Sequence, residues 1–324
     1  MQFAVPPRKS YHTPPYARSS RVSLQRRKQL KVVAIAGLGL LALFFLISRI
    51  FSSSSSDLDD VSIATSGVVI VTVLDHALYS ENYLHKIIQN REDYARRHGY
   101  TNFIANVSDY ESALDGAPRS WAMVPALRHA MASHSHSKYF FHLGPHALIM
   151  NPSISLESHV LDSKRIESLM MKDVSVVPPD SIIKTFSHLK SNDVDVIFTQ
   201  DKQDISPDSF IIKQGEFARF FLDVWFDPLY RKYNFAKAEI HALDHIVQWH
   251  PTILARLALV PQRILNAYSR DSPQVAVDGA YTEGDFVIQL SGCASDAMQS
   301  CEKEIEPYYA TWTKKFRNEQ SLLS

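Results

Sequence analysis

A continuous apolar segment, residues 32–51 (VVAIAGLGLLALFFLISRIF), constrains what the N-terminal part of this chain can form. A helix of about 20 such residues is long enough to cross roughly 30 Å of hydrocarbon. The one charged residue in the segment, Arg49, stands near its far end, where a long side chain can extend to the lipid headgroups. We therefore predict a transmembrane anchor over residues 32–51.

The charges on either side of this segment give the anchor a direction. Residues 1–31 carry eight basic side chains and no acidic one. Basic residues before a span keep that side in the cytosol, so we predict a single-pass type II membrane protein with a signal-anchor and a lumenal C-terminal part. Residues 52–65, which include a serine string, form the predicted stem. A cleaved signal peptide is the alternative, although its apolar region is typically about 7–15 residues and closer to the N-terminus.

The remaining chain is acidic. Nine of the 34 basic residues and none of the 34 acidic residues precede Asp57, so the remainder carries 25 basic and 34 acidic residues, a net charge of about −9. A nucleic-acid partner requires a basic face, and this part of the chain offers none. About 260 residues are enough for one large α/β domain. We find no internal repeat and no second linker.

Two short patterns fit a lumenal location. Cys293 and Cys301 are the two cysteines of the chain, and an oxidising lumen favours a disulfide between them. Two free, buried thiols are the alternative. Asn106 begins an Asn-Val-Ser sequon and is the candidate glycosylation site, whereas Pro152 disqualifies Asn151. Such triplets also arise by chance.

Short apolar runs alternate with helical patterns after residue 66. Strands are predicted over residues 67–74, 100–105, 138–143, 194–199, 210–212 and 285–290. Helices are predicted over residues 81–98, 120–132, 216–226 and 239–249, the first capped by Ser80 and ended by Gly99. This alternation favours an α/β fold with a mostly parallel sheet, helices on both faces, and a ligand site at the carboxyl ends of the strands. A Rossmann-like nucleotide-sugar fold is compatible with it, but periodicity alone does not name that fold.

Five segments of the chain, taken together, resemble one family. They are residues 90–100 (NREDYARRHGY), 120–122 (SWA), 147–152 (ALIMNP), 244–251 (DHIVQWHP) and 286–293 (FVIQLSGC). In order and at this spacing they resemble the fungal Golgi α-1,6-mannosyltransferase and α-galactosyltransferase family, which also contains plant xyloglucan xylosyltransferases. The pattern looks most like the branch that contributes to the Golgi mannan polymerase complex. The resemblance covers nearly all of residues 68–315.

The resemblance implies a fold, a reaction and partners. It implies a GT-A glycosyltransferase domain over residues 66–315, followed by a short tail over residues 316–324. The implied reaction is retaining mannosyl transfer from GDP-mannose to an N-glycan acceptor, in a Golgi membrane hetero-oligomer with other mannosyltransferase subunits. An α-galactosyltransferase that uses UDP-galactose is an alternative. In the family, two aspartates of a D-x-D motif and a late histidine hold Mn²⁺, which neutralises the departing diphosphate.

The chain departs from the family pattern at four places. Gly144 and His146 stand at the D-x-D positions, and Gln289 stands at the late histidine. Met123 replaces a lysine, so no Lys or Arg occupies a matching position, and residues 206–208 (Ser-Pro-Asp) replace an Asn-x-Gly stretch. A conventional Mn²⁺ site cannot be assembled from these residues. We therefore expect no measurable Mn²⁺ binding there and little transfer by the isolated chain, and a non-catalytic scaffold subunit is the alternative function.

The candidate site residues follow from the same comparison. Asp201, after a buried strand, and Asp244, on a helix, are the candidate catalytic carboxylates; solvated charges are the alternative for both. His146 is a candidate metal ligand, and a hydrogen-bonded structural histidine is the alternative. The aromatic Trp121 is a core residue first and a sugar platform second. The candidate donor-binding residues are Leu74, Asn90, Trp121, Met123, Gly144, His146, Gln289 and Gly292.

Overall fold

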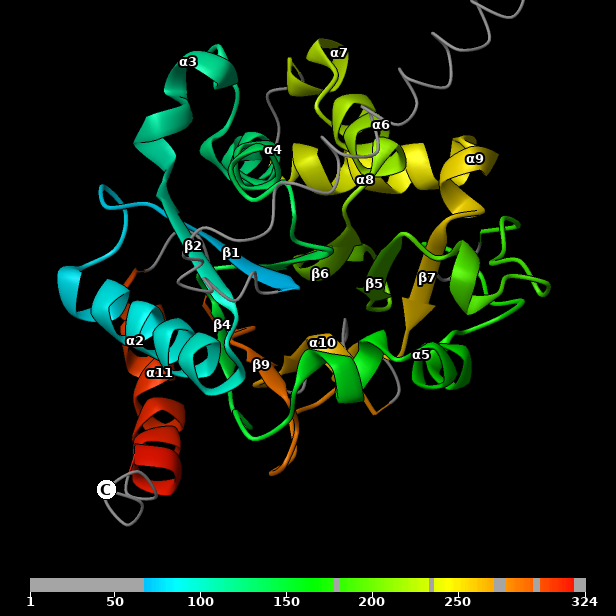
Figure 1. The fold of residues 1–324 in the computed structure, drawn as a ribbon. Helices are drawn as coiled ribbons and strands as arrows, with labels where there is room; N and C mark the ends of the chain where they lie inside the picture. Colours follow the sequence, from blue (N-terminus) through cyan, green and yellow to red (C-terminus); the bar gives the residue numbers. More distant parts are fainter. Residues whose placement is uncertain (1–66, 178–180, 233–235, 271–277, 294–297, 318–324) are drawn as a thin grey trace, which may run out of the picture. The chain divides into compact units, whose positions relative to one another are not determined.

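The computed structural model describes residues 67–177, 181–232, 236–270, 278–293 and 298–317 (Figure 1). The predicted cytosolic tail, anchor and stem lie outside these ranges, as does the end of the predicted C-terminal tail. Within the described ranges, no helix combines the length and the apolar character that a membrane span requires.

Six strands form the main sheet in the order β2-β1-β3-β6-β5-β7. They are β1 (Val68–Leu74), β2 (Thr101–Asn106), β3 (Tyr139–Leu143), β5 (Val196–Gln200), β6 (Ile205–Lys213) and β7 (Leu257–Val260). β1 pairs in parallel with β2 and β3, and β5 pairs in parallel with β7, whereas β6 is antiparallel to both of its neighbours. The predicted mostly parallel sheet is confirmed, with β6 as the exception. A turn over residues 201–204 joins β5 to β6, and so short a connection permits only an antiparallel pair.

Helices cover both faces of this sheet. The longer ones are α2 (Glu81–His98), α4 (Met123–Ser133), α6 (Glu216–Trp225), α8 (Ala238–Trp249) and α11 (Met298–Trp312). The shorter helices and turns are η1 (Val107–Tyr110), α3 (Glu111–Leu114), η2 (Arg119–Ala122), η3 (Glu157–Leu161), α5 (Ser163–Leu169), η4 (Ser191–Asp193), α7 (Pro228–Arg231), α9 (Pro251–Leu254), α10 (Gln262–Leu265) and η5 (Thr313–Arg317). In Figure 1, α4, α6 and α8 lie on one face, and α2 and α11 lie on the other.

β1 is buried along its whole length because its side chains alternate between two cores. Val69, Val71 and Val73 pack in the core that contains side chains of α4, α6 and α8. Val68 and Ile70 pack in a second core that contains side chains of α2. The continuous β-branched run therefore forms the strand, buried on both faces, that the sequence predicts.

The caps of α2 are those predicted. The Ser80 hydroxyl accepts a hydrogen bond from the Tyr83 amide at the start of the helix. Gly99 ends it with φ 66°, in the left-handed region where glycine is strongly favoured. The helix predicted over residues 120–132 instead begins as the 3-10 turn η2 and continues as α4 from Met123, so that Pro125 lies in the first turn of α4, where its missing N–H costs no hydrogen bond.

A second, smaller sheet lies beside the first. It contains β4 (Ala147–Ile149), β9 (Val287–Gln289) and β8 (Ala267–Tyr268), in the order β4-β9-β8. β9 accounts for the strand predicted over residues 285–290. It pairs antiparallel with β4, so that Gln289 lies opposite Ala147, and the Leu290 amide donates to the His146 carbonyl. The late segment of the chain is thereby held next to the turn that follows β3.

The structure joins Cys293 to Cys301 as a disulfide. Both residues are buried in a core with side chains of α2 and α11. A cross-link over so short a loop stabilises a protein by about 2–3 kcal/mol, through the entropy of the unfolded chain. We expect the Cys293→Ser/Cys301→Ser variant to lose about that much in urea unfolding. Reduced wild-type protein should lose a similar amount, and an unchanged midpoint in both would contradict the prediction.

Candidate functional site

A cavity of about 320 Å³ opens at the carboxyl ends of β1 and β3, where the sequence predicts the ligand site. Its walls come from the segment after β1, from η1, η2 and the start of α4, from the turn after β3, from β6 and from α8. The lining residues are Val73, Asp75, Leu78, Tyr79, Val107, Arg119, Ser120, Ala122, Met123, His142, Gly144, Pro145, His146, Pro207, Asp208, Glu239 and Ile240.

The turn 144–146 forms one wall of this cavity, directly after β3. A fully buried cation, Arg91 of α2, holds the turn from behind. Its Nη2 donates to the carbonyls of Gly144 (3.0 Å) and Ala147 (2.7 Å), and its Nη1 donates to Asn90 Oδ1 (2.6 Å). Burial lowers the pKa of Arg91 to about 9. Because its hydrogen bonds go to the backbone on either side of the turn, the Arg91 guanidinium stabilises the turn and is not among the lining residues of the cavity.

The two histidines of the cavity are neutral. His146 Nε2 lies 2.6 Å from the Tyr79 hydroxyl, and burial lowers the pKa of His146 to about 4. His142 is 3% exposed, its Nδ1 has no hydrogen-bond partner among the described residues, and burial lowers its pKa to about 3. The Tyr79 contact matches the alternative drawn from the sequence, that of a hydrogen-bonded structural histidine at position 146.

Three carboxylates and one guanidinium also line the cavity. Arg119 forms a two-pronged ion pair with Asp75, with Nε 2.8 Å from Oδ2 and Nη2 3.1 Å from Oδ1. Burial, and next the charge of Glu239, raise the pKa of Asp208 to about 6. Glu239 is 8% exposed, and its Oε2 has no partner among the described residues. The described walls of the cavity are therefore rich in negative charge.

The residues at the family's metal positions do not fit Mn²⁺. Gly144 has no side chain, and a Cβ there would lie 3.1 Å from the Asp208 carbonyl oxygen. His146 shares its Nε2 with Tyr79. Gln289 is buried with its Oε1 unpartnered among the described residues, but it does not line the cavity. The structure therefore offers no D-x-D-type site at these positions.

Two other groups of potential ligands lie in the described ranges. One combines His146 with Cys293 and Cys301, whose sulfurs are joined to each other and cannot act as thiolates. The other combines Asp204, His241 and Asp244. In that group Asp204 lies 3.8 Å from the Lys237 ammonium, and none of its three members lines the cavity.

The candidate catalytic residues do not reach the cavity. Asp201 Oδ1 accepts from the amides of Gln203 (2.7 Å) and Asp204 (2.9 Å), and its Oδ2 accepts from the Tyr268 hydroxyl (2.9 Å). It shapes the β5–β6 turn and lines a different hollow of about 680 Å³. Asp244 lies on α8, and the acidic residue of α8 that lines the cavity is Glu239 rather than Asp244.

Asp244 is a buried carboxyl that accepts from the Ile205 amide (3.0 Å). Burial, together with the neighbouring charges of Asp204 and Asp201, raises its pKa to about 7. Because the folded state holds this proton more tightly than the unfolded state does, stability declines as pH rises from about 4 through 7. We expect Asp244→Asn to gain on the order of 2 kcal/mol at pH 8 and nothing at pH 4.

Urea unfolding at several pH values would measure this. Asp115→Asn is the matched control, since Asp115 is exposed and its φ of 51° suits asparagine. If the gain in unfolding free energy for Asp244→Asn does not increase with pH, ionisation of the Asp244 carboxyl does not destabilise the folded state.

The predicted donor-binding residues divide into two groups. Met123, Gly144 and His146 line the cavity. The other five do not line it: Leu74, Asn90, Trp121, Gln289 and Gly292. Asn90 bridges α2 to β4 by hydrogen bonds to both backbone groups of Ile149, and Trp121 is a core aromatic.

Two further residues have other surroundings. Gly292 lies against Arg270 and Glu304 rather than the cavity. Asn106, the glycosylation candidate, is half-buried, and its side chain accepts from the Ser108 amide at the start of η1.

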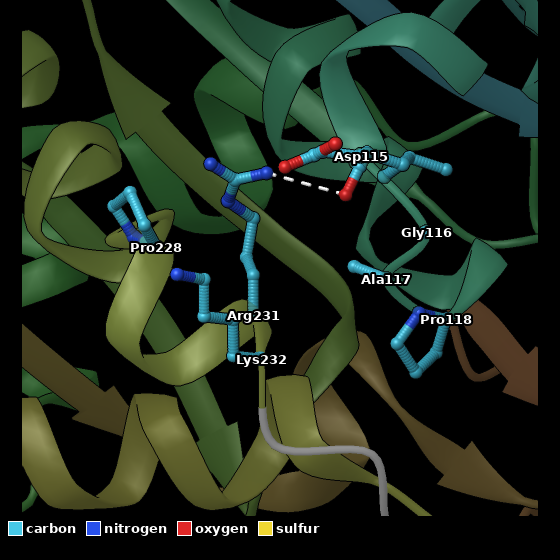
Figure 2. Close-up of a pocket in the computed structure, with 8 residues that line it drawn as sticks. Asp115, Gly116, Ala117, Pro118, Pro228, Arg231 and Lys232 are labelled. Carbon is cyan, nitrogen blue, oxygen red and sulfur yellow. Dashed lines mark hydrogen bonds between the residues drawn. The ribbon is translucent and has the colours of Figure 1, made fainter.

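A smaller hollow of about 220 Å³ lies between α7 and the loop that leads to η2. Figure 2 shows the side chain of Arg231 extending toward the loop that carries Asp115 and Gly116. Its Nη1 donates to the carbonyls of Ala113 (2.9 Å) and Leu114 (3.2 Å), and its guanidinium lies 4.3 Å from the centre of the Phe226 ring. Arg231 therefore braces the loop that carries Arg119 into the larger cavity.

Sequence reasoning missed Arg119 and Glu239. Arg119 lies four residues before Met123, which stands where the resemblance places a lysine. A comparison limited to that position therefore does not identify Arg119. Glu239 lies on the same helix as Asp244, and only the packing of α8 decides which of the two faces the cavity.

Comparison with known proteins gives the family. Residues 64–301 match the model of the galactosyl transferase GMA12/MNN10 family. An uncharacterised α-1,2-galactosyltransferase of Schizosaccharomyces pombe is 36% identical over 230 residues, 71% of this chain and 68% of that protein. The probable α-1,6-mannosyltransferase MNN11 of Saccharomyces cerevisiae is 31% identical over 260 residues, 75% of this chain and 61% of that protein.

Other similarities are more distant. An α-1,2-galactosyltransferase of S. pombe is 29% identical over 231 residues, 70% of this chain and 60% of that protein. The crystal structure of a glycosyltransferase involved in glycosylation of the major capsid of PBCV-1 has a TM-score of 0.48 and 11% identity, over 74% of this chain and 98% of that one. Because the family model covers most of the sequence, this chain belongs to the galactosyl transferase GMA12/MNN10 family of glycosyltransferases.

Proposed function

We propose that this chain is a Golgi membrane subunit of an α-1,6-mannosyltransferase complex of the mannan polymerase type. In this proposal a GT-A domain transfers mannose from GDP-mannose to N-glycan mannan with retention of configuration, beside other mannosyltransferase subunits. The observation that carries the proposal is the cavity at the carboxyl ends of β1 and β3, with charged groups on its walls. The relative MNN11, named as a probable α-1,6-mannosyltransferase, supports the choice of sugar and linkage.

The cavity offers distinct surroundings to the parts of such a donor. Arg119 is the one Lys or Arg among the described lining residues, and Asp75 fixes its orientation, so we assign it to the diphosphate. Leu78, Met123 and Ile240 supply apolar surface for a base or the face of a sugar ring. The neutral, half-buried His146 adds no positive charge.

UDP-galactose is the second candidate donor. The 36% identity to a protein named as an α-1,2-galactosyltransferase favours it. The two donors differ in both base and sugar, so a direct comparison separates them. The full-length chain, purified alone and with co-purified subunits, would be given each labelled donor and an α-mannoside acceptor. We expect transfer from GDP-mannose to exceed transfer from UDP-galactose, and the reverse order would assign the second donor.

A non-catalytic scaffold is the second candidate role. The lack of a side chain at Gly144 and of a histidine at position 289 favours it, since the fold is kept while the usual metal ligands are not. Under this role the chain co-purifies with an active homologue, whose transfer is lost on depletion of this chain. Recovery of the chain as a lone, active monomer at native expression levels would exclude it.

The type II topology has its own expected result. The basic tail before the apolar segment 32–51 favours a cytosolic N-terminus. In sealed Golgi vesicles, added protease should remove only the tail, and residues after 60 should become sensitive when detergent is added. Digestion of the C-terminal part in intact vesicles would reverse the orientation.

A further inference from the structure

Two of the four departures from the family pattern meet in space. In the family pattern that the sequence resembles, the first aspartate of D-x-D corresponds to Gly144 and the glycine of Asn-x-Gly corresponds to Asp208. The Gly144 amide donates to the Asp208 carbonyl at 2.6 Å, across the β3–β6 pair. The chain has therefore lost a carboxylate at one position and gained one at the position in contact with it.

The gained carboxylate lies close to where the lost one would be. A Cβ built on Gly144 would lie 3.6 Å from Asp208 Oδ1. Among the described residues Gly144 is not one of the glycines with positive φ, so its backbone does not require glycine. An aspartate at 144 would place a second carboxylate beside that of Asp208, and its Cβ would lie 3.1 Å from the Asp208 carbonyl oxygen.

A second carboxylate of the cavity has no partner. Glu239 of α8 is more than nine-tenths buried and lines the same cavity, and its Oε2 accepts no hydrogen bond from any described residue. Asp208 lines the same cavity, and the charge of Glu239 raises the pKa of Asp208, whereas that of Lys237 lowers it. A buried, unpaired carboxylate oxygen is costly unless a ligand satisfies it. An anionic donor would add to this repulsion, whereas a cation would relieve it.

We propose that Asp208 and Glu239 together bind a divalent cation, which replaces the metal site lost at Gly144. This inference rests on the proposed binding of a nucleotide sugar in the cavity, and it replaces the metal-free cavity expected from the sequence alone. Mg²⁺ and similar hard cations are commonly held by one or two carboxylates together with substrate phosphates. Two protein ligands are therefore enough if the donor's diphosphate supplies others, and the cation should bind well only with nucleotide.

The experiment measures Mn²⁺ binding by the full-length chain, from the loss of the free-Mn²⁺ electron paramagnetic resonance signal, without nucleotide and with GDP or UDP. Asp208→Gly should weaken nucleotide-dependent Mn²⁺ binding at least ~10-fold, because removal of even an outer-shell partner costs about 10–100-fold. The exchange variant Gly144→Asp/Asp208→Gly returns a carboxylate to the family position and should recover most of the loss. Asp115→Gly is the control, since it removes an exposed carboxylate that is not among the lining residues of the cavity and relieves a positive φ.

The recovery by the double variant makes the result specific, because a merely misfolded Asp208→Gly protein would not regain the cation when a second residue is changed. If nucleotide binds equally with and without Mn²⁺, the relocated site is wrong while the nucleotide cavity stands. If neither nucleotide binds under any condition, both the relocated site and the proposed function are wrong. Mn²⁺ binding that is unchanged in Asp208→Gly would also overturn the relocated site.

Discussion

Replacement of Arg91 by Met should destabilise the protein by about 3–5 kcal/mol and remove donor binding with it. Arg91 is fully buried and donates to the carbonyls of Gly144 and Ala147 and to the side chain of Asn90. Each buried acceptor left without a donor costs about 1–3 kcal/mol, and methionine can satisfy none of them. The turn that forms one wall of the cavity loses its support at the same time.

Urea unfolding of the full-length variant measures the first effect. Arg96→Met is the matched control, because Arg96 lies on the same helix with its side chain 66% exposed and a 3.5 Å ion pair to Asp93. An exposed pair of this kind contributes at most about 1 kcal/mol. A similar small loss for Arg91→Met would mean that the turn after β3 is held by other contacts.

Arg119→Met should lower kcat/KM for donor transfer about 100-fold. Arg119 is the one Lys or Arg among the described residues of the cavity wall, and it faces the space where we place the diphosphate. Loss of one preorganised donor to developing negative charge typically costs about 10²–10³ in rate. Steady-state transfer assays with the co-purified complex would measure it.

Two further variants show whether the charge of Arg119 acts on the donor. Arg119→Lys keeps the charge but not the two-pronged pairing with Asp75, and it should recover part of the activity. Arg128→Met, on the neighbouring α4, removes an exposed cation paired with Asp223 and should leave transfer unchanged. If Arg119→Met is as active as Arg128→Met, the diphosphate does not lie where we propose.

The sequence predicted those features of the fold that depend on local chemistry. Ser80 and Gly99 bound α2 because a side-chain cap and a left-handed residue are local requirements. The turn 144–146 lies at the carboxyl end of the strand next to β1, as predicted, because both strands are marked by buried apolar runs. The antiparallel direction of β6 was not predicted, since it depends on a tight turn over residues 201–204 rather than on a pattern within the strand.

Which residues line the cavity depends on contacts between distant parts of the chain, and local sequence patterns do not predict such contacts. Asp208 was recognised as a departure from the family, but its contact with Gly144 follows from the β3–β6 pairing. Asp244 and Glu239 lie on one helix, and the packing of that helix places Glu239, which was not predicted, in the cavity wall instead of Asp244. Asn90, in a segment that carries the family resemblance, supports the fold instead of the ligand.

The central claim is that the cavity beside β1 and β3 binds a nucleotide sugar, and calorimetric titration of the full-length chain with GDP-mannose and UDP-galactose, each in the presence of Mn²⁺, tests it most directly. Ser120→Trp would fill the cavity from an exposed position on its wall, and Lys232→Trp would place the same group in the smaller hollow. We predict that the wild type and Lys232→Trp bind one of the donors with similar affinity, and that Ser120→Trp binds it at least ~10-fold more weakly. Equal binding by all three proteins, or no binding of either donor by the wild type, would contradict the account.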